Sequence, residues 1–266
     1  MKAIKISTIL VLIISFCFVL SSQEKLTAKQ IMDKSFETMK LAGSEAVSTM
    51  TIIDNKGRER VRQIAMVTKL FNSGDTEKRL LRFLSPPDVK GTGLLVFDYK
   101  EKDDDMWLFM PALRKTRRIV SSERAKSFMG SEFSYADMAP PILDEFTYNI
   151  LTETVAEGTL CWEIEMMPVN ENIADENGFS KRITYIGKKD FVIRKAVYFD
   201  LDGELHKELA VKEIKELDTK NHKYRPLHMV MINKQNNRKS VLKVDKIQFN
   251  PNVKDDYFTT RYLERY

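Results

Sequence analysis

The chain has 266 residues, of which 43% are hydrophobic and 30% are charged, and its formal net charge is +5 at pH 7. Without the first 22 residues, which carry two lysines and no acidic residue, the charge falls to +3, and so nearly balanced a chain does not indicate a nucleic-acid-binding protein. Only one of its two cysteines, Cys161, lies beyond that first segment, which excludes a fold stabilised by internal disulfides.

The N-terminal segment has the pattern of a secretory signal peptide. Lys2 and Lys5 give it a basic start, and residues 9–20 are apolar but too few to span a membrane as a helix. The small residue Ser22 predicts cleavage at its position. Residues 1–22 are therefore expected to be a signal peptide, and an uncleaved membrane anchor is the alternative.

The exported chain would then consist of residues 23–266, a length that suits one large β domain. Acylation of Cys17 is not expected, because Phe16 precedes it where a lipoprotein signal needs a small residue. An exported chain with a lone thiol fits the bacterial envelope better than a eukaryotic extracellular module. We therefore expect a periplasmic protein, soluble or loosely associated with a membrane, and no nucleic acid among its partners.

Residues 27–39 predict one amphipathic helix. Thr27 and Gln30 have the spacing of a capping box, and Gly43 can end the helix. The apolar stripe of this helix is expected to pack on a sheet. It consists of Ala28, Ile31, Met32, Phe36 and Met39.

Beyond this helix the sequence predicts about eleven to thirteen strands. Short runs rich in β-branched and aromatic residues are separated by turn signals, and most connections are too short to hold a crossover helix. The sheet is therefore expected to be antiparallel, and the absence of repeats and low-complexity linkers favours a single domain over 23–266. The turn signals are DNKG (54–57), AEGT (156–159), GKKD (187–190), LDGE (201–204) and KQNNRK (234–239).

Residues 121–146 break the strand pattern. Aromatic and methionine side chains are scattered there among serine, glycine and acidic residues, and Pro140 and Pro141 exclude a helix across them. We expect a long excursion with a short helix that lies over another part of the molecule. Segments of this kind are often lids or binding loops, and an ordinary packed loop is the alternative.

Three predicted strands are apolar on both faces, although an antiparallel sheet usually has one wet face. They are residues 93–97, 106–110 and 228–232. The N-terminal helix, the excursion, a second sheet or a bound ligand must therefore cover both sides. The 13 methionines fit either a cavity for variable apolar shapes or a methionine-rich core. Side chains of the second strand alternate: Trp107 and Phe109 point to one side, and Met106, Leu108 and Met110 to the other.

Signals for catalysis and metal binding are weak. Three histidines have no metal-ligand spacing, and no nucleophile, phosphate-binding or dinucleotide motif occurs. The aspartates at 103–105 are expected to form a solvated turn, and DLDGE at 200–204 a hairpin turn rather than a calcium loop. Cys161 is expected to be a buried small residue rather than a nucleophile. We therefore expect no enzymatic activity, no metal and no cofactor.

Four segments, in this order and spacing, resemble the LolA-like family of outer-membrane lipoprotein-sorting proteins. They are RFLSPPDVKGTGLLVFDY (82–99), DDMWLFMPALRKTRRI (104–119), SFMGSEFSYADM (127–138) and YFTTRYLERY (257–266). The resemblance implies a mainly β fold with a few helices: a curved antiparallel half-open β-barrel around an apolar cavity, covered by helices and a lid loop. It also implies that relatives carry lipoprotein acyl chains or other lipids through the periplasm.

Site residues follow from the resemblance as expectations. Which side of the strand 106–110 faces the cavity stays open, although the bulk of Trp107 favours a structural role for its set. The arginines of the basic turn are expected to pair with headgroup phosphates or an anionic partner. The alternative is a hairpin whose side chains are only solvated. The cavity candidates are Leu94, Val96, Met106, Trp107, Leu108, Phe109, Met110, Met229 and Met231; the lid candidates are Phe128, Met129, Phe133, Tyr135 and Met138; the basic turn comprises Arg114, Lys115, Arg117 and Arg118.

The expected function is a non-catalytic periplasmic carrier that holds lipid or lipoprotein acyl chains for transfer to the outer membrane. Expected partners are those acyl chains, a resistance-nodulation-division-type exporter or an inner-membrane release complex. The chain differs from the founding carrier in its length and in the whole segment 127–138, so these residues do not choose between lipoprotein and another lipid as cargo. The alternative is an envelope structural or adhesive protein, or an exporter accessory protein that binds a protein partner without lipid.

Overall fold

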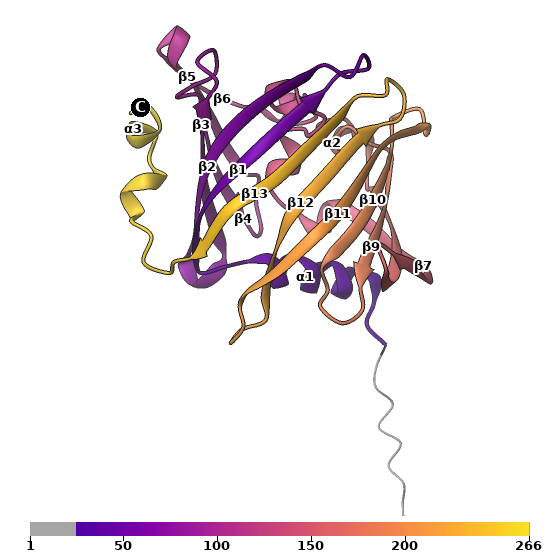
Figure 1. Cartoon of the computed structure of the whole chain (residues 1–266). Helices are drawn as coiled ribbons and strands as arrows, with labels where there is room; N and C mark the ends of the chain where they lie inside the picture. The colour runs from indigo at the N-terminus through magenta and orange to yellow at the C-terminus, as the bar shows by residue number, and fades with distance from the viewer. Residues whose placement is uncertain (1–24, 266) are drawn as a thin grey trace, which may run out of the picture.

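A computed structural model describes residues 25–265, so the predicted signal peptide and its cleavage site lie outside the described residues. The strands of the described part form one antiparallel sheet in the order β6-β5-β4-β3-β2-β1-β13-β12-β11-β10-β9-β8-β7. The sheet curls around α1 and does not close, because the two strands at its ends, β6 and β7, do not pair (Figure 1). The predicted half-open β-barrel architecture is confirmed.

Thirteen strands form this sheet, the upper end of the predicted range. Each of the five predicted turn signals joins two consecutive strands. The helices are α1 (Ala28–Met39), α2 (Glu171–Asn177) and α3 (Thr260–Leu263). The strands are β1 (Gly43–Ile53), β2 (Glu59–Phe71), β3 (Thr76–Ser85), β4 (Gly93–Tyr99), β5 (Asp105–Met110), β6 (Lys115–Arg118), β7 (Phe146–Ala156), β8 (Thr159–Pro168), β9 (Lys181–Gly187), β10 (Ile193–Phe199), β11 (Leu205–Asp218), β12 (Lys223–Asn233) and β13 (Lys239–Phe249).

Helix α1 begins as the sequence predicts. The Thr27 hydroxyl accepts the backbone N–H of Gln30 at 3.2 Å, and the Gln30 side chain accepts the N–H of Thr27 at 2.8 Å. This capping box satisfies two backbone donors that a helix start leaves open. The apolar stripe then packs into the concave side of the sheet, where Ile31 and Met32 are fully buried.

The predicted role of Gly43 is wrong. The helix ends at Met39, and Lys40 leads directly into extended backbone. Gly43 instead starts β1 beside the end of β13, where an added Cβ would lie 2.2 Å from the carbonyl oxygen of Asn250. The glycine is therefore required by the close approach of two backbone segments and not by a helix end.

Apolar side chains cover both faces of the sheet at its β3–β5 end. The concave core contains the helix stripe, the inward residues of most strands and part of the excursion. A second, convex cluster lies on the outer side of β3–β5, where the C-terminal segment packs (Figure 1). Its buried members are Leu80, Leu95, Phe109, Val253, Phe258 and Leu263.

The excursion is as long as predicted but contains no α-helix. Four separate 3₁₀ turns replace the expected short helix: Ser121–Glu123, Phe128–Gly130, Ala136–Met138 and Leu143–Glu145. Tight turns suit this composition, since serine, glycine and proline interrupt every apolar run. The segment is well packed, and five consecutive residues, 131–135, are buried.

Candidate functional site

A cavity of about 320 Å³ lies on the concave side of the sheet. Its wall combines α1, strands from both halves of the sheet and residues 136–141 of the excursion. Methionine provides an adaptable part of this wall, because its unbranched side chain can adjust to different apolar shapes. The lining methionines are Met39, Met50, Met66, Met138 and Met229.

The nine predicted cavity residues divide into three groups. Met229 lines the cavity. Six others belong to the concave core or pack against it without lining the cavity: Leu94, Val96, Met106, Leu108, Met110 and Met231. Trp107 and Phe109 lie on the opposite side of the sheet, in or against the convex cluster. The structure therefore places the predicted strand beside the cavity's supporting core, and the cavity wall is built mainly elsewhere.

The two sets of side chains in β5 face different permanent layers. Met106 and Leu108 are 1% and 3% exposed within the concave core, while Phe109 is 4% exposed in the convex cluster. The convex face is covered by the C-terminal residues around Phe258 and Leu263, which sequence reasoning did not consider as a cover. The aromatic and leucine residues of the C-terminal segment are the sequence feature that could have predicted this cover.

The five predicted lid residues also divide. Phe133 and Met138 line the cavity. Phe128 is fully buried in the concave core, 5.9 Å from the Phe83 ring and 5.6 Å from the Tyr135 ring by centroids. Tyr135 is buried as well, and Met129 packs against the same core. The lid candidates therefore belong to one segment with two roles: residues 127–135 form an anchored plug, and residues 136–141 form a strap that lines the cavity.

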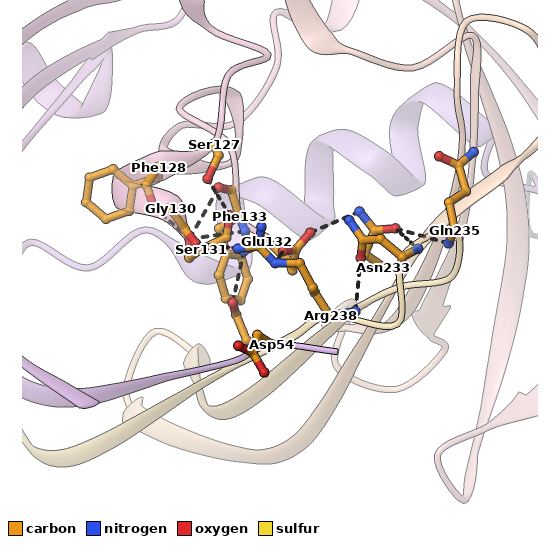
Figure 2. A network of polar contacts seen from close by, with 12 residues as sticks. Asp54, Ser127, Phe128, Gly130, Ser131, Glu132, Phe133, Asn233, Gln235 and Arg238 are labelled. Carbon is orange, nitrogen blue, oxygen red and sulfur yellow. Dashed lines mark hydrogen bonds and ion pairs between the residues drawn. The ribbon is translucent and has the colours of Figure 1, made fainter. Parts of the chain in front are cut away.

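The plug is fastened to the turn between β12 and β13 by buried polar contacts. Glu132 Oε1 forms an ion pair with Arg238 Nε at 2.9 Å, and Glu132 Oε2 accepts a hydrogen bond from Asn233 Nδ2 at 3.0 Å. The Glu132 N–H donates to the Ser240 hydroxyl at 2.9 Å. Figure 2 shows Glu132 and Arg238 lying between the plug and this turn. Glu132 is 5% exposed, so water does not replace these contacts. If the plug moved, Glu132 and its partners would therefore lose their polar contacts while still buried, which is unfavourable.

Two arginines from the sheet and one from the turn between β12 and β13 also donate to backbone carbonyls of the excursion. Arg238 Nη2 lies 2.9 Å from the carbonyl oxygen of Gly130, and Arg62 Nη1 donates to that of Met129. Arg79 Nη1 donates to the carbonyl of Met138, which lies in the strap. One guanidinium bond and the side-chain contact between Asp137 and Tyr198 of β10 therefore tie the strap to the sheet, whereas more contacts hold the plug.

A network of buried charges lies in the cavity wall. Arg225 Nη2 is 3.0 Å from Glu77 Oε1, and Arg79 Nη2 lies 2.5 Å from Glu77 Oε2 and 3.1 Å from Asp98 Oδ2. Burial favours the protonated form of Glu77, but the charges of Arg79 and Arg225 outweigh it and hold the Glu77 pKa at about 2. Sequence reasoning missed this network, because alternation alone does not show which polar residues point inward.

Asp104 contradicts the expected solvated turn. Its side chain is 2% exposed, and Arg124 Nη2 of the excursion lies 3.1 Å from its Oδ2. Burial raises the Asp104 pKa to about 7; the charge of Arg124 opposes this shift and the neighbouring Asp98 adds to it. The turn before β5 is therefore a buried attachment point for the start of the excursion.

The basic turn lies away from the cavity wall. Arg117 pairs with Glu123 at 2.6 Å, and Arg118 pairs with Asp105. Arg114 and Lys115 are exposed, and neither has an acidic partner within 4.0 Å in the described part of the chain. None of the four lines the cavity. The structure therefore leaves two of these cations available to an external partner.

Metal-ligating and thiol side chains are a further feature of the described residues. Residues 25–265 contain no cluster of three or more histidine, cysteine, aspartate or glutamate side chains arranged to hold a metal ion. Burial raises the pKa of the Cys161 thiol, which makes it a poor nucleophile at neutral pH. No helix in this part of the chain is both long enough and apolar enough to cross a membrane. The most distinctive feature is an apolar cavity with charged groups in its wall.

Solved structures share this architecture over nearly the whole chain. An outer membrane lipoprotein-sorting protein domain from Vibrio parahaemolyticus is 25% identical, with a TM-score of 0.81 over 90% of this chain and 98% of that chain. A DUF1329 family protein from Desulfovibrio piger is also 25% identical, with a TM-score of 0.81 over 89% of this chain and 97% of that chain. A LolA superfamily protein from Nitrosomonas europaea is 16% identical, with a TM-score of 0.68 over 90% and 100%, and shows the fold alone.

Sequence comparisons add one match. A family model described as that of an uncharacterized protein covers residues 75–265, which include β3 to β13 and the C-terminal segment. No curated protein matches the chain. The matched region of this chain contains the excursion, the convex cluster and the buried charge network.

Proposed function

The chain belongs to a LolA-like family, and from this premise we propose that it is a non-catalytic carrier that holds the acyl chains of lipids or lipoproteins in its concave cavity. We further propose that it works in the periplasm and delivers its cargo toward the outer membrane. The N-terminal signal pattern and the names of the relatives support this location. Residues 23–266 would act as a single domain.

The cavity itself is the observation that carries this proposal. Its lining is mostly apolar, and its volume lies at the small end of the range typical for ligand pockets. Burying an acyl chain contributes about 0.8 kcal/mol per methylene group, so about ten buried groups would contribute about 8 kcal/mol. That free energy corresponds to about micromolar affinity, which is enough for specific binding. Because residues 136–141 cover the cavity, entry and exit of an acyl chain would be served by a moving part.

We assign that moving part to the strap of residues 136–141. The plug beside it is held by Glu132 and by two arginine bonds. The strap is fastened to the sheet by the bond from Arg79 to the Met138 carbonyl and by the side-chain contact between Asp137 and Tyr198. Displacing the strap would uncover the apolar wall and break few contacts. Met138 of the strap lines the cavity, and its displacement would make room that an acyl chain could take.

External contacts of the carrier are assigned to the basic turn. Arg114 and Lys115 are exposed beside the edge strand β6, where anionic headgroups or an acidic protein surface could pair with them. A resistance-nodulation-division-type exporter or an inner-membrane release complex would be the protein partner.

Native mass spectrometry of the protein purified from its own envelope tests the carrier function. We expect a co-purified lipid or acyl-chain adduct, and reloading of the delipidated protein with a fluorescent fatty-acid analogue. A protein that is lipid-free when isolated and binds no acyl probe would contradict the proposal. That result would favour an envelope protein or exporter accessory that binds a protein partner.

A further inference from the structure

One arginine in the cavity wall has hydroxyl partners, Thr184 and Tyr198, but lacks the carboxylate partner that its neighbours have. Arg182 of β9 lines the cavity, and its Nη2 is buried without a hydrogen-bond partner. Its Nε donates to the Thr184 hydroxyl at 3.2 Å. No carboxylate of residues 25–265 lies within 4.0 Å of its guanidinium, whereas Arg79 and Arg225 both pair with Glu77.

Aromatic rings fix the position of this guanidinium. The Cζ of Arg182 lies 5.8 Å from the centroid of the Phe179 ring and 5.7 Å from that of Tyr198, and both aromatic residues also line the cavity. A planar guanidinium held against rings with a free N–H is prepared to donate to an oxyanion, and it loses little freedom when it does so. The free donor therefore indicates a missing acceptor.

Register across the sheet places a second unpartnered donor in the same row. Tyr148 of β7 is opposite Met166 of β8, Met166 is opposite Arg182, and Arg182 is opposite Tyr198 of β10. Residues that are opposite one another in adjacent strands share a face. The Tyr148 hydroxyl is buried without a partner, and burial raises its pKa, so it stays a neutral donor.

The one acidic side chain of the strap in the cavity wall is already engaged. Asp137 Oδ2 accepts the Ser134 N–H at 2.7 Å and the Ser134 hydroxyl at 2.9 Å. This arrangement closes the turn that leads into the strap. Asp137 also interacts with the Tyr198 hydroxyl, and it lies more than 4.0 Å from the Arg182 guanidinium. The wall at β9 therefore presents a positive charge to the cavity interior.

We propose that Arg182 binds the anionic headgroup, a carboxylate or a phosphate, of an amphiphile whose acyl chain occupies the cavity. The inference rests on the proposed carrier function and specifies which cargo the cavity selects. A neutral amphiphile would bury its chain equally well, and its hydroxyl could accept the Nη2 hydrogen bond, but it would supply no negative charge to pair with Arg182. Selection is therefore expected at the headgroup and not along the chain.

Binding of three probes with the same chain tests this assignment: palmitate, hexadecyl phosphate and hexadecanol. Dissociation constants are measured at pH 7.5 for the delipidated full chain, by displacement of a neutral fluorescent acyl probe. We expect at least one anionic probe to bind the wild type about tenfold or more tightly than hexadecanol, a difference of the size that a charge-assisted hydrogen bond gives. Preference for palmitate would indicate a free fatty acid, and preference for hexadecyl phosphate a phosphate headgroup.

Two substitutions on the same strand separate a site effect from a charge effect. Arg182→Gln should abolish the preference while leaving hexadecanol binding unchanged. Lys181→Gln removes the same charge from the neighbouring residue, which lies over the Phe199 ring and does not line the cavity, and should keep the preference. Arg182→Lys keeps the charge without the planar guanidinium and should retain part of the anionic preference. If the Arg182→Gln variant does not fold, the Arg182→Lys variant is compared with Lys181→Gln instead.

Three outcomes would overturn the proposal in distinguishable ways. Equal binding of all three probes to the wild type would reject headgroup selection and leave the carrier function standing. An anionic preference that survives Arg182→Gln would place the site elsewhere. Absence of binding by every probe would reject the carrier function itself.

Discussion

Arg225 of β12 and Glu77 of β3 are joined across the concave face of the sheet, with 3.0 Å between Nη2 and Oε1. Three strands, β2, β1 and β13, separate them in the sheet, so this ion pair connects the two walls of the half-barrel. Both side chains line the cavity, and Arg79 links the same carboxylate to the strap through Met138. Cavity shape, strap position and buried charge therefore depend on one another.

Replacing Arg225 with Met should destabilise the protein by about 3 kcal/mol, because removal of one partner leaves the buried Glu77 charge poorly compensated. Urea unfolding at pH 7 measures this change. Adding Glu77→Gln to the variant should recover part of the loss, since the uncompensated charge disappears. If the two residues do not interact, the effects of Arg225→Met and Glu77→Gln on the unfolding free energy should simply add in the double variant. That additive result would contradict the prediction.

Asp104 should make folding stability fall as pH rises from about 4 to 7. Burial raises the Asp104 pKa from the ordinary aspartate value of 3.8 to about 7, so between these values the folded state binds more protons than the unfolded state. The contribution is complete below pH 3.8 and is lost as pH rises through the folded pKa, by at most about 1.4 kcal/mol per pH unit.

Asp104→Asn, which resembles the protonated form, should remove this decline, and the quantity to follow is the difference in unfolding free energy between wild type and variant across pH 4–8. Glu77 acts in the opposite direction below pH 4.5, since its lowered pKa makes stability fall with acidification in both proteins. A difference that does not change with pH would show that Asp104 is charged throughout.

Glutamate substitutions in two strands should separate permanent core from cavity wall. Leu108→Glu and Phe109→Glu should both destabilise the fold by several kcal/mol, because each buries a carboxylate between fixed apolar layers. Met229→Glu should fold and yet exclude acyl chains, since its side chain lines the cavity. Thermal unfolding and lipid content are the two measurements.

Val230→Glu is the matched control, because it changes the neighbouring residue of β12 with the opposite side-chain direction. It should keep both the melting temperature and the lipid. Comparable unfolding of the Met229 and Leu108 variants would mean that the cavity is part of a solid core.

Glu132→Gln should loosen the plug. The substitution removes the negative charge that Arg238 and Asn233 contact, at a side chain that is 6% exposed. We expect a stability loss of about 2–4 kcal/mol and faster amide hydrogen exchange in residues 127–135. Glu153→Gln is the control, because it breaks an ion pair with Lys188 in which the Glu153 side chain is 49% exposed. This substitution should lower the unfolding free energy by less than about 1 kcal/mol. Equal exchange in both variants would show that Glu132 does not hold the plug.

The sequence by itself determined the architecture, because local patterns set it. The capping box at Thr27, the turn signals and the short apolar runs predict a helix followed by an antiparallel sheet, and the structure confirms this order. The doubly apolar runs also indicated that both faces of β4 and β5 are covered. These features depend on residues close together in the chain, whose spacing is visible without the fold.

Only the tertiary structure decided what covers each face and where the cavity lies. Phe109 faces the C-terminal segment because Leu263, more than a hundred residues later, packs on the convex side, and no periodicity predicts that contact. The charges at Glu77, Arg225 and Arg182 acquire their roles from strands that meet only when the sheet curls. Burial and pairing of a polar side chain are properties of the assembled sheet, and this is the physical reason that the site could not be derived from local sequence.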